Sequence, residues 1–258
     1  SENYSCKYGT EVQSVHFGAS RTQCTLHTGM IYSQNFSQGF ATLSQSLRHD
    51  PAAITAHLKQ ILNYYLLQLP NIKKIHFMSD GPTTQYRNRK MFYIITQYFP
   101  LCYPQIQFIS YNFSDAGHGK SAADGIGGFL KRSADDQVKF GKDISNFDKL
   151  ITVLRGSTNK IYIDVVTSPQ IEIIDTLLPE KFRPFIGTMN MHQYTWSREN
   201  SGLILFNSLM CLDCQPGTMC EHFSMGEINY NDNRLKLASP KEKKTLKRSQ
   251  KVSVVADE

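Results

Sequence analysis

The sequence has no apolar run long enough to cross a membrane and no amino-terminal signal peptide. Its longest apolar stretch, Ile61–Leu69, is short and interrupted by polar residues, whereas a membrane-spanning helix needs about 20 apolar residues. The segment Ser1–Tyr4 has no basic start followed by an apolar run, which argues against secretion. A starting methionine is also absent, which favours a fragment or a processed chain. We therefore expect a protein that is neither membrane-bound nor secreted.

An internal repeat, a helix-turn-helix pattern and an evenly spaced cysteine ladder are absent as well. Without a secretory signal, reduced thiols are expected rather than a disulfide framework. Three of the six cysteines gather near the carboxyl end and three are scattered, at Cys6, Cys24 and Cys102.

Basic charge is concentrated near the carboxyl end. Between Lys236 and Lys251 stand seven Lys or Arg residues and one acidic residue, an excess equal to the net charge of +6 of the whole chain. The remainder is close to neutral, which favours a basic tail over a basic domain. Residues 233–258 have few bulky apolar side chains and are predicted to be disordered. The run from Lys241 to Arg248 is typical of a nuclear import signal or a DNA-binding arm, or else of a solubilising end. The first interpretation gives nuclear localisation, and the alternative is cytoplasmic.

The chain carries enough apolar residues, 40% of the total, for a sizeable core. Asp50 and Pro51 predict a helix start, with the N-cap followed by proline at the first helical position, and Pro70 ends that helix. Branched and aromatic runs predict strands, and apolar residues at helical spacing predict helices. The expected order is strands 14–17, 22–32 and 40–47, helix 50–69, buried strand 72–78, helix 84–98, strand 106–113, a helix ending near residue 141 and helix 145–155.

This order predicts an α/β fold. Three early strands without helices between them indicate an antiparallel meander, and the later alternation indicates parallel additions. The order is that of an RNase H-like mixed sheet flanked by helices, although other α/β sheets share this periodicity. Residues 157–210 are predicted to form an α+β extension, with a strand at 161–166, a short helix from Ser168 and two strands around the turn 198–202.

Asp80 is the first candidate for chemistry. It follows the predicted strand 72–78, at the sheet edge where ligand-binding loops of open sheets gather. The sequence Asp80-Gly81-Pro82 is equally typical of a plain turn.

A glycine-rich stretch from Gly117 to Gly128 is the second candidate. A phosphate-binding loop needs Gly, four residues, then Gly-Lys-Ser or Gly-Lys-Thr, but Ser114 stands at the first Gly position. If a helix begins near Gly119, Asp124 lies on its second turn, with two glycines and Lys131 on the same side. Glycines there would let a nucleic-acid backbone come close, or would let the helix pack tightly on a sheet.

Several segments together carry a family resemblance: Ser1–Cys6, Ser79–Gly81 with Gln85–Asn88, Gly117–Lys120, and Asp124–Gly128 with Lys131-Arg132. Over about residues 1–222 the chain resembles eukaryotic, transposon-derived proteins that are common in animal genomes. The resemblance implies an RNase H-like core of the DDE/D nuclease or transposase type.

The resemblance also implies roles for acids. Asp80 would be the second acid and Asp124 the third, while the first would lie on a strand just before Glu2. Residues 1–156 would then be a core lacking the first-strand Asp. Such carboxylates hold Mg²⁺ or Mn²⁺, two ions about 3.5–4 Å apart, which activate the attacking oxygen and stabilise the leaving one. His118 would assist near the metals, or is a polar loop residue.

DNA is the partner that this resemblance implies, and self-association is compatible with it. Basic side chains would contact phosphates and Tyr86 would stack on a base, whereas the alternative for the segment after Asp80 is a solvated helix face. The candidate nucleic-acid contacts are Lys120, Lys131, Arg132, Arg87, Arg89, Lys90 and Tyr86.

A Cys/His cluster follows in residues 211–232. Three thiols and one imidazole suit a tetrahedral Zn²⁺ of structural type, and free thiols or a disulfide are the alternatives. The cluster consists of Cys211, Cys214, Cys220 and His222.

The sequence therefore leaves three candidate functions. The first is a transposon-derived, metal-dependent DNA nuclease or strand transferase. The second is a domesticated, inactive relative that binds nucleic acid or protein. The third, which the motif supports least, is a phosphate-binding loop protein.

Overall fold

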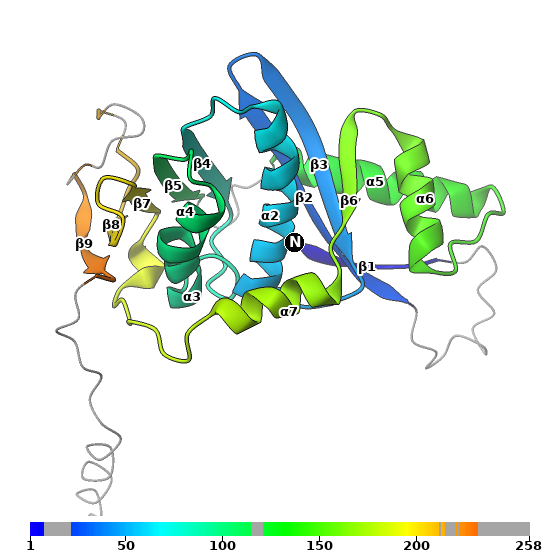
Figure 1. The fold of residues 1–258 in the computed structure, drawn as a ribbon. Helices are drawn as coiled ribbons and strands as arrows, with labels where there is room; N and C mark the ends of the chain where they lie inside the picture. Colours follow the sequence, from blue (N-terminus) through cyan, green and yellow to red (C-terminus); the bar gives the residue numbers. More distant parts are fainter. Residues whose placement is uncertain (8–21, 115–120, 212, 215–219, 221, 232–258) are drawn as a thin grey trace, which may run out of the picture.

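The computed structural model describes residues 1–7, 22–114, 121–211, 213–214, 220 and 222–231. Two sheets stand on either side of a long central helix, and further helices pack on each sheet (Figure 1). None of the described helices has the length and apolar character needed to span a membrane. The helices are α2 (Pro51–Gln68), α3 (Arg89–Tyr93), the π-helix η1 (Ile94–Tyr98), α4 (Phe99–Cys102), α5 (Ala122–Lys139), α6 (Phe147–Ser157), α7 (Ser168–Leu177) and the 3₁₀-helix η2 (Thr188–Asn190).

The first sheet has the strand order β1-β2-β3-β6. Its first three strands are antiparallel, and β6 lies parallel to β3. Side chains alternate between the two faces of β2: His27 stacks on His57 of α2, whereas the Thr28 hydroxyl donates to the Ala123 carbonyl of α5 over 3.1 Å. The strands are β1 (Glu2–Ser5), β2 (Gln23–Ser33), β3 (Phe36–Ser44) and β6 (Ile161–Val165).

The second sheet has the order β4-β5-β7-β8-β9. Strands β4 and β5 are parallel, and the remaining pairs are antiparallel. Strand β5 is buried throughout, but β4 alternates between exposed and half-buried residues because it is the edge strand. The prediction of a buried strand at 72–78 was therefore wrong about burial. The strands are β4 (Lys74–Ser79), β5 (Phe108–Phe113), β7 (Gln193–Ser197), β8 (Leu203–Asn207) and β9 (Ser224–Asn229).

Helix α2 joins the two cores. The Asp50 carboxylate accepts from the Ala53 N–H over 3.1 Å, which caps the helix as predicted. One side of α2 packs Leu58 and Leu62 into the core of the second sheet, and Tyr65 packs with Phe40 of the first. On the opposite face of the first sheet, α5 and α6 pack through residues that include Leu130, Ala134 and Leu150.

The α/β class and the antiparallel start are confirmed, but the strands form two mixed sheets rather than one. The RNase H-like arrangement stays a prediction. Strand 14–17 falls outside the described residues, and β1 provides the third antiparallel strand instead. The helix predicted from residue 84 begins at Arg89, because Asn88 caps it by accepting from the N–H groups of Lys90 and Met91.

The carboxyl-terminal strands join sheets already present. Strand β6 pairs with β3, and β7 pairs with β5. The strands expected around the turn 198–202 are β7 and β8. The proposed boundaries at 156, 210 and 232 stay predictions, and the basic tail lies outside the described residues.

Candidate functional site

Asp80 directly follows the last residue of β4. Its side chain is exposed, and the Ser79 hydroxyl donates to its backbone carbonyl over 2.6 Å. Parallel pairing of β4 with β5 fixes where the strand ends. Asp80 is therefore presented at the edge of the second sheet, as the sequence predicted, with its carboxylate exposed.

Asp124 lies on the first turn of α5, not on the second, because the helix begins at Ala122 rather than near residue 119. Its Oδ2 accepts from the Ser121 backbone N–H over 2.9 Å and from the Ser121 hydroxyl over 3.2 Å. These bonds cap the helix and orient the carboxylate. Both go to one oxygen, so Oδ1 remains available for a ligand.

The two acids are far apart in the chain but border the same cleft. Both line a single cleft of about 1180 Å³ between the two sheets. Burial lowers the pKa of the Ser1 ammonium, and the charges of Asp80, Glu2 and Asp124 act on it in the opposite direction. Asp80 and Asp124 therefore both lie near enough to Ser1 to act on its charge, although burial outweighs their effect.

Glu2 is engaged elsewhere. Its Oε2 lies 2.5 Å from the Lys131 ammonium, and a Cβ added at Gly127 would stand 3.2 Å from its Oε1. Glycine at position 127 thus makes room for Glu2 between β1 and α5. Gly127 is buried, so it lets α5 pack tightly on the sheet. A nucleic-acid backbone cannot come close to it there.

The other candidate contacts differ in exposure. Tyr86 and Arg87 are buried: Tyr86 packs 5.6 Å from Tyr111 between ring centroids, and Arg87 lies over the Phe113 ring and donates to the Met189 carbonyl. Neither can stack on a base or reach a phosphate without local unfolding, because the segment before α3 folds inward. Exposed candidates are Arg89, Lys90 and Arg132, while His118 and Lys120 lie outside the described residues.

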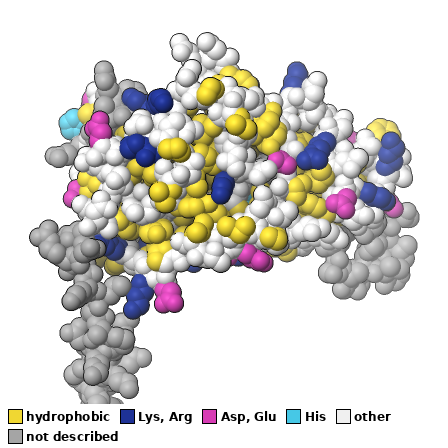
Figure 2. Space-filling view, in the orientation of Figure 1, with side chains coloured by type: hydrophobic (Ala, Val, Ile, Leu, Met, Phe, Trp, Pro, Cys, Tyr) yellow, Lys and Arg dark blue, Asp and Glu magenta, His cyan; other side chains and the backbone are white. Residues whose placement is uncertain are grey.

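Basic side chains do not merge into a patch on the face shown in Figure 2. Lys and Arg are scattered there among Asp, Glu and apolar residues. Electrostatic binding of nucleic acid to that face therefore has little support.

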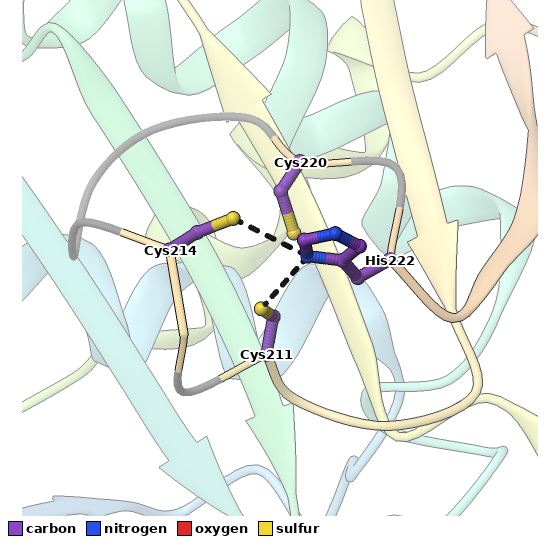
Figure 3. Close-up of side chains that lie close together, drawn as sticks. All are labelled: Cys211, Cys214, Cys220 and His222. Atoms are coloured by element: carbon purple, nitrogen blue, oxygen red, sulfur yellow. Dashed lines mark hydrogen bonds between the residues drawn. The ribbon is translucent and has the colours of Figure 1, made fainter.

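The Cys/His cluster is the second constellation. Its ligand atoms all lie within 4.8 Å of one another, and the Sγ atoms of Cys211 and Cys214 each lie 3.4 Å from His222 Nδ1. Tetrahedral zinc with bonds of about 2.0–2.3 Å separates its ligands by about 3.5–3.8 Å. The four side chains point toward one another (Figure 3), so the cluster could hold a metal ion such as zinc. No other group of three or more potential ligands in the described part of the chain is placed to do so.

Ionisation of the cluster favours a metal. A hydrogen bond from the Cys214 backbone and another from His222 lower the pKa of Cys211 to about 6. The neighbouring Cys211 thiolate raises the pKa of Cys214 to about 11. One thiolate is thus ready at neutral pH, while a second forms only if a cation compensates its charge.

Two features of this site were not foreseen. Sequence patterns gave no reason to bring Cys211, Cys214 and Cys220 to the cleft that Asp80 and Asp124 line, yet all five border it. The buried His27–His57 stack was also missed, because single histidines on a strand and a helix carry no pairing signal.

Comparison with known proteins gives a family but no activity. A domain of unknown function (DUF8701) matches residues 1–203, and the chain belongs to this family. No curated protein and no solved structure matches the chain.

Proposed function

We propose that the chain is the core of a metal-dependent DNA nuclease or strand transferase, in which Asp80 and Asp124 hold the metal. One observation carries the proposal: Asp80 follows a strand of the second sheet and Asp124 lies on a helix packed against the first, yet both line one cleft. The family resemblance of the Asp80 and Asp124 motifs adds the expected type of reaction.

The donor chemistry fits Mg²⁺ or Mn²⁺. Exposed carboxylate oxygens are the ligands that these hard cations prefer. When bound, the ions would activate an attacking oxygen and stabilise a leaving one. Two acids make an incomplete set, and the resemblance places the third on a strand before Glu2.

Asp80 and Asp124 would reach the metal from different elements. Asp80 would bind the metal from the end of β4. Asp124 would bind through Oδ1, because Ser121 holds Oδ2. The same capping bonds weaken the phosphate-loop alternative, since the side chain of Asp124 already satisfies the first free N–H of α5.

Arg132 is the exposed candidate for DNA contact on the helix that carries Asp124. Its guanidinium lies over Gly128 on α5, where a Cβ would stand 3.2 Å from Nη1. It is exposed, whereas the charge of Lys131 is compensated by Glu2.

A cleavage assay tests the proposal. A longer chain that includes the first acid expected before Glu2 would be incubated with labelled DNA and Mg²⁺ or Mn²⁺, beside its Asp80→Asn and Asp124→Asn variants. Asparagine keeps the size of Asp and can still accept the capping bonds, so loss of activity would report the charge. Asp136→Asn is the matched control, because Asp136 is an exposed acid of the same helix that pairs with Lys139.

We expect cleavage by this longer chain and by its Asp136→Asn variant, and loss of cleavage in the Asp80→Asn and Asp124→Asn variants. Cleavage that survives both substitutions would remove the proposed roles. DNA binding without cleavage would favour the inactive, domesticated binder instead.

The Cys/His cluster supports a second, structural function. We propose that it holds one Zn²⁺ through Cys211, Cys214, Cys220 and His222. Four protein ligands fill a tetrahedral zinc, so no position is left for a substrate. The ion would fix the segment between β8 and β9 beside the cleft.

A further inference from the structure

The cleft between the two sheets runs along two strand edges that lack partners among the described residues. Strand β1 pairs with β2 only as far as Glu2 opposite Leu26, although β2 continues to Ser33. Strand β4 pairs with β5 on one edge, and no described strand pairs with the other. Both open stretches line the same cleft. Unpaired N–H and C=O groups along such edges are a template for another strand.

The cleft has one apolar wall and one polar wall. Leu58, Leu62 and Tyr65 of α2 line one side, and Ser121 and Asp124 of α5 line the other. A strand between these walls would place alternate side chains against each. The occupant should therefore alternate between apolar and polar residues.

The register of β1 leads into this cleft. Continuing the β1–β2 pairing places Ser1 opposite His27, and the positions before Ser1 opposite Thr28 to Ser33. His27 faces α2 and Thr28 faces α5, so partners of odd-numbered β2 residues would also face α2. Ser1 borders the cleft, so a residue joined to its amino group would lie inside.

We infer that the cleft receives an extended segment joined to the amino group of Ser1, which forms a strand between β2 and β4 and unites the two sheets into one. Residues opposite Gly29, Ile31 and Ser33 would be apolar and contact α2. Those opposite Thr28 and Met30 would be polar or small and face α5. This inference does not rest on metal binding, because it follows from strand edges and packing.

Chains with designed extensions test the inference. One carries Val-Thr-Val-Thr-Val-Thr before Ser1, one residue for each position from Ser33 back to Thr28, which places valines against α2. The matched control carries Thr-Val-Thr-Val-Thr-Val, which has the same composition and β-propensity but turns the valines toward the polar wall. Hydrogen exchange of backbone amides is measured in both chains and in the chain that begins at Ser1.

We expect the first extension to slow exchange in both β2 (28–33) and β4 (74–79) and to raise the melting temperature, while the control does so much less. Unchanged exchange in both strands, or protection of only one of them, would overturn the inference. Equal protection by both extensions would also overturn the inference, because the two walls of the cleft would then not distinguish the two alternations of apolar and polar residues. Protection that appears without an extension and rises with protein concentration would assign the cleft to a second copy of the chain.

Discussion

The Lys131 ammonium lies 2.5 Å from a Glu2 carboxylate oxygen and so joins helix α5 to strand β1. Both side chains are partly exposed, at 33% and 47%, and a pair in such a position contributes at most about 1 kcal/mol to stability. Glu2 compensates the charge of Lys131, whereas the neighbouring Arg132 has no carboxylate among its described contacts.

That difference predicts separate effects on DNA binding. The double substitution Glu2→Gln with Lys131→Gln leaves the net charge unchanged and should leave the salt dependence of binding unchanged. Arg132→Gln should reduce the slope of log K against log salt by about 0.9, the value for one lost phosphate contact. Fluorescence anisotropy over a salt series measures both, and an equal loss in the two variants would contradict the distinction.

Two glycines give opposite predictions for alanine. At Gly81 an added Cβ would overlap the guanidinium of Arg87, which is held by Met189 and Phe113. Gly81→Ala should therefore lower the free energy of unfolding by about 1–3 kcal/mol.

Gly125 is the matched control. Nothing lies within 4 Å of a Cβ added there, and the residue is inside α5. Gly125→Ala should raise the free energy of unfolding by about 0.5–1 kcal/mol. Urea unfolding measures both changes, and a stable Gly81→Ala protein would show that Arg87 is not held in place.

Local sequence signals were sufficient to predict individual helix starts and strands. Asp50-Pro51 predicted the start of α2, and alternating or branched runs predicted β2, β3 and β5, because caps and side-chain periodicity act within a few residues. The basic segment after Asp80 shows the limit of local signals, because Arg87 was expected to be solvated or to contact phosphate and is buried. Whether Arg87 is solvated or lies over Phe113 is decided by β5, a strand distant in sequence.

The site divides in the same way. The candidate metal ligands of the Cys/His cluster could be predicted from their spacing, since three of the four fall within ten residues. That Asp80 and Asp124 border one cleft depends on how the two sheets are placed in the fold, which no local pattern encodes. The split into two sheets was likewise invisible, because it depends on which strand edges find partners.

The buried histidine pair predicts loss of stability in mild acid. His27 and His57 stack with ring centroids 5.3 Å apart. Burial lowers the pKa of His57 to about 3 and holds that of His27 well below its ordinary value. Below about pH 6.5 the unfolded chain therefore binds more protons than the folded chain. The stability that the two neutral histidines contribute is fully present above that pH and is lost as the pH falls.

Between pH 7.5 and 5.5 each histidine should reduce the free energy of unfolding by about 1.4 kcal/mol. Urea unfolding at several pH values measures this slope. His57→Gln should remove about half of it, whatever the variant does to stability at neutral pH. A slope that His57→Gln leaves unchanged would show that the pair is not its source.

Zinc removal should loosen the segment after β8. The purified chain should contain one zinc, and a chelator should lower its melting temperature by at least about 2–4 °C, the shift that 1 kcal/mol produces in a domain of this size. Rebinding at pH 7.5 should release protons, because the raised pKa of Cys214 keeps that thiol protonated without metal.

Elemental analysis and calorimetry in two buffers measure zinc content and proton release. Cys214→Ser should abolish binding, while Cys102→Ser, a cysteine outside the cluster, should retain it. Equal zinc content in the two variants would rule out the assigned ligands.

Binding of Mn²⁺, followed by its electron paramagnetic resonance signal, tests most directly whether Asp80 and Asp124 hold one cation. Asp80→Asn and Asp124→Asn should each weaken that binding nearly as much as the double variant, since a shared ion loses its site when either ligand is lost. Independent, additive losses, or an affinity that neither substitution changes, would contradict the account.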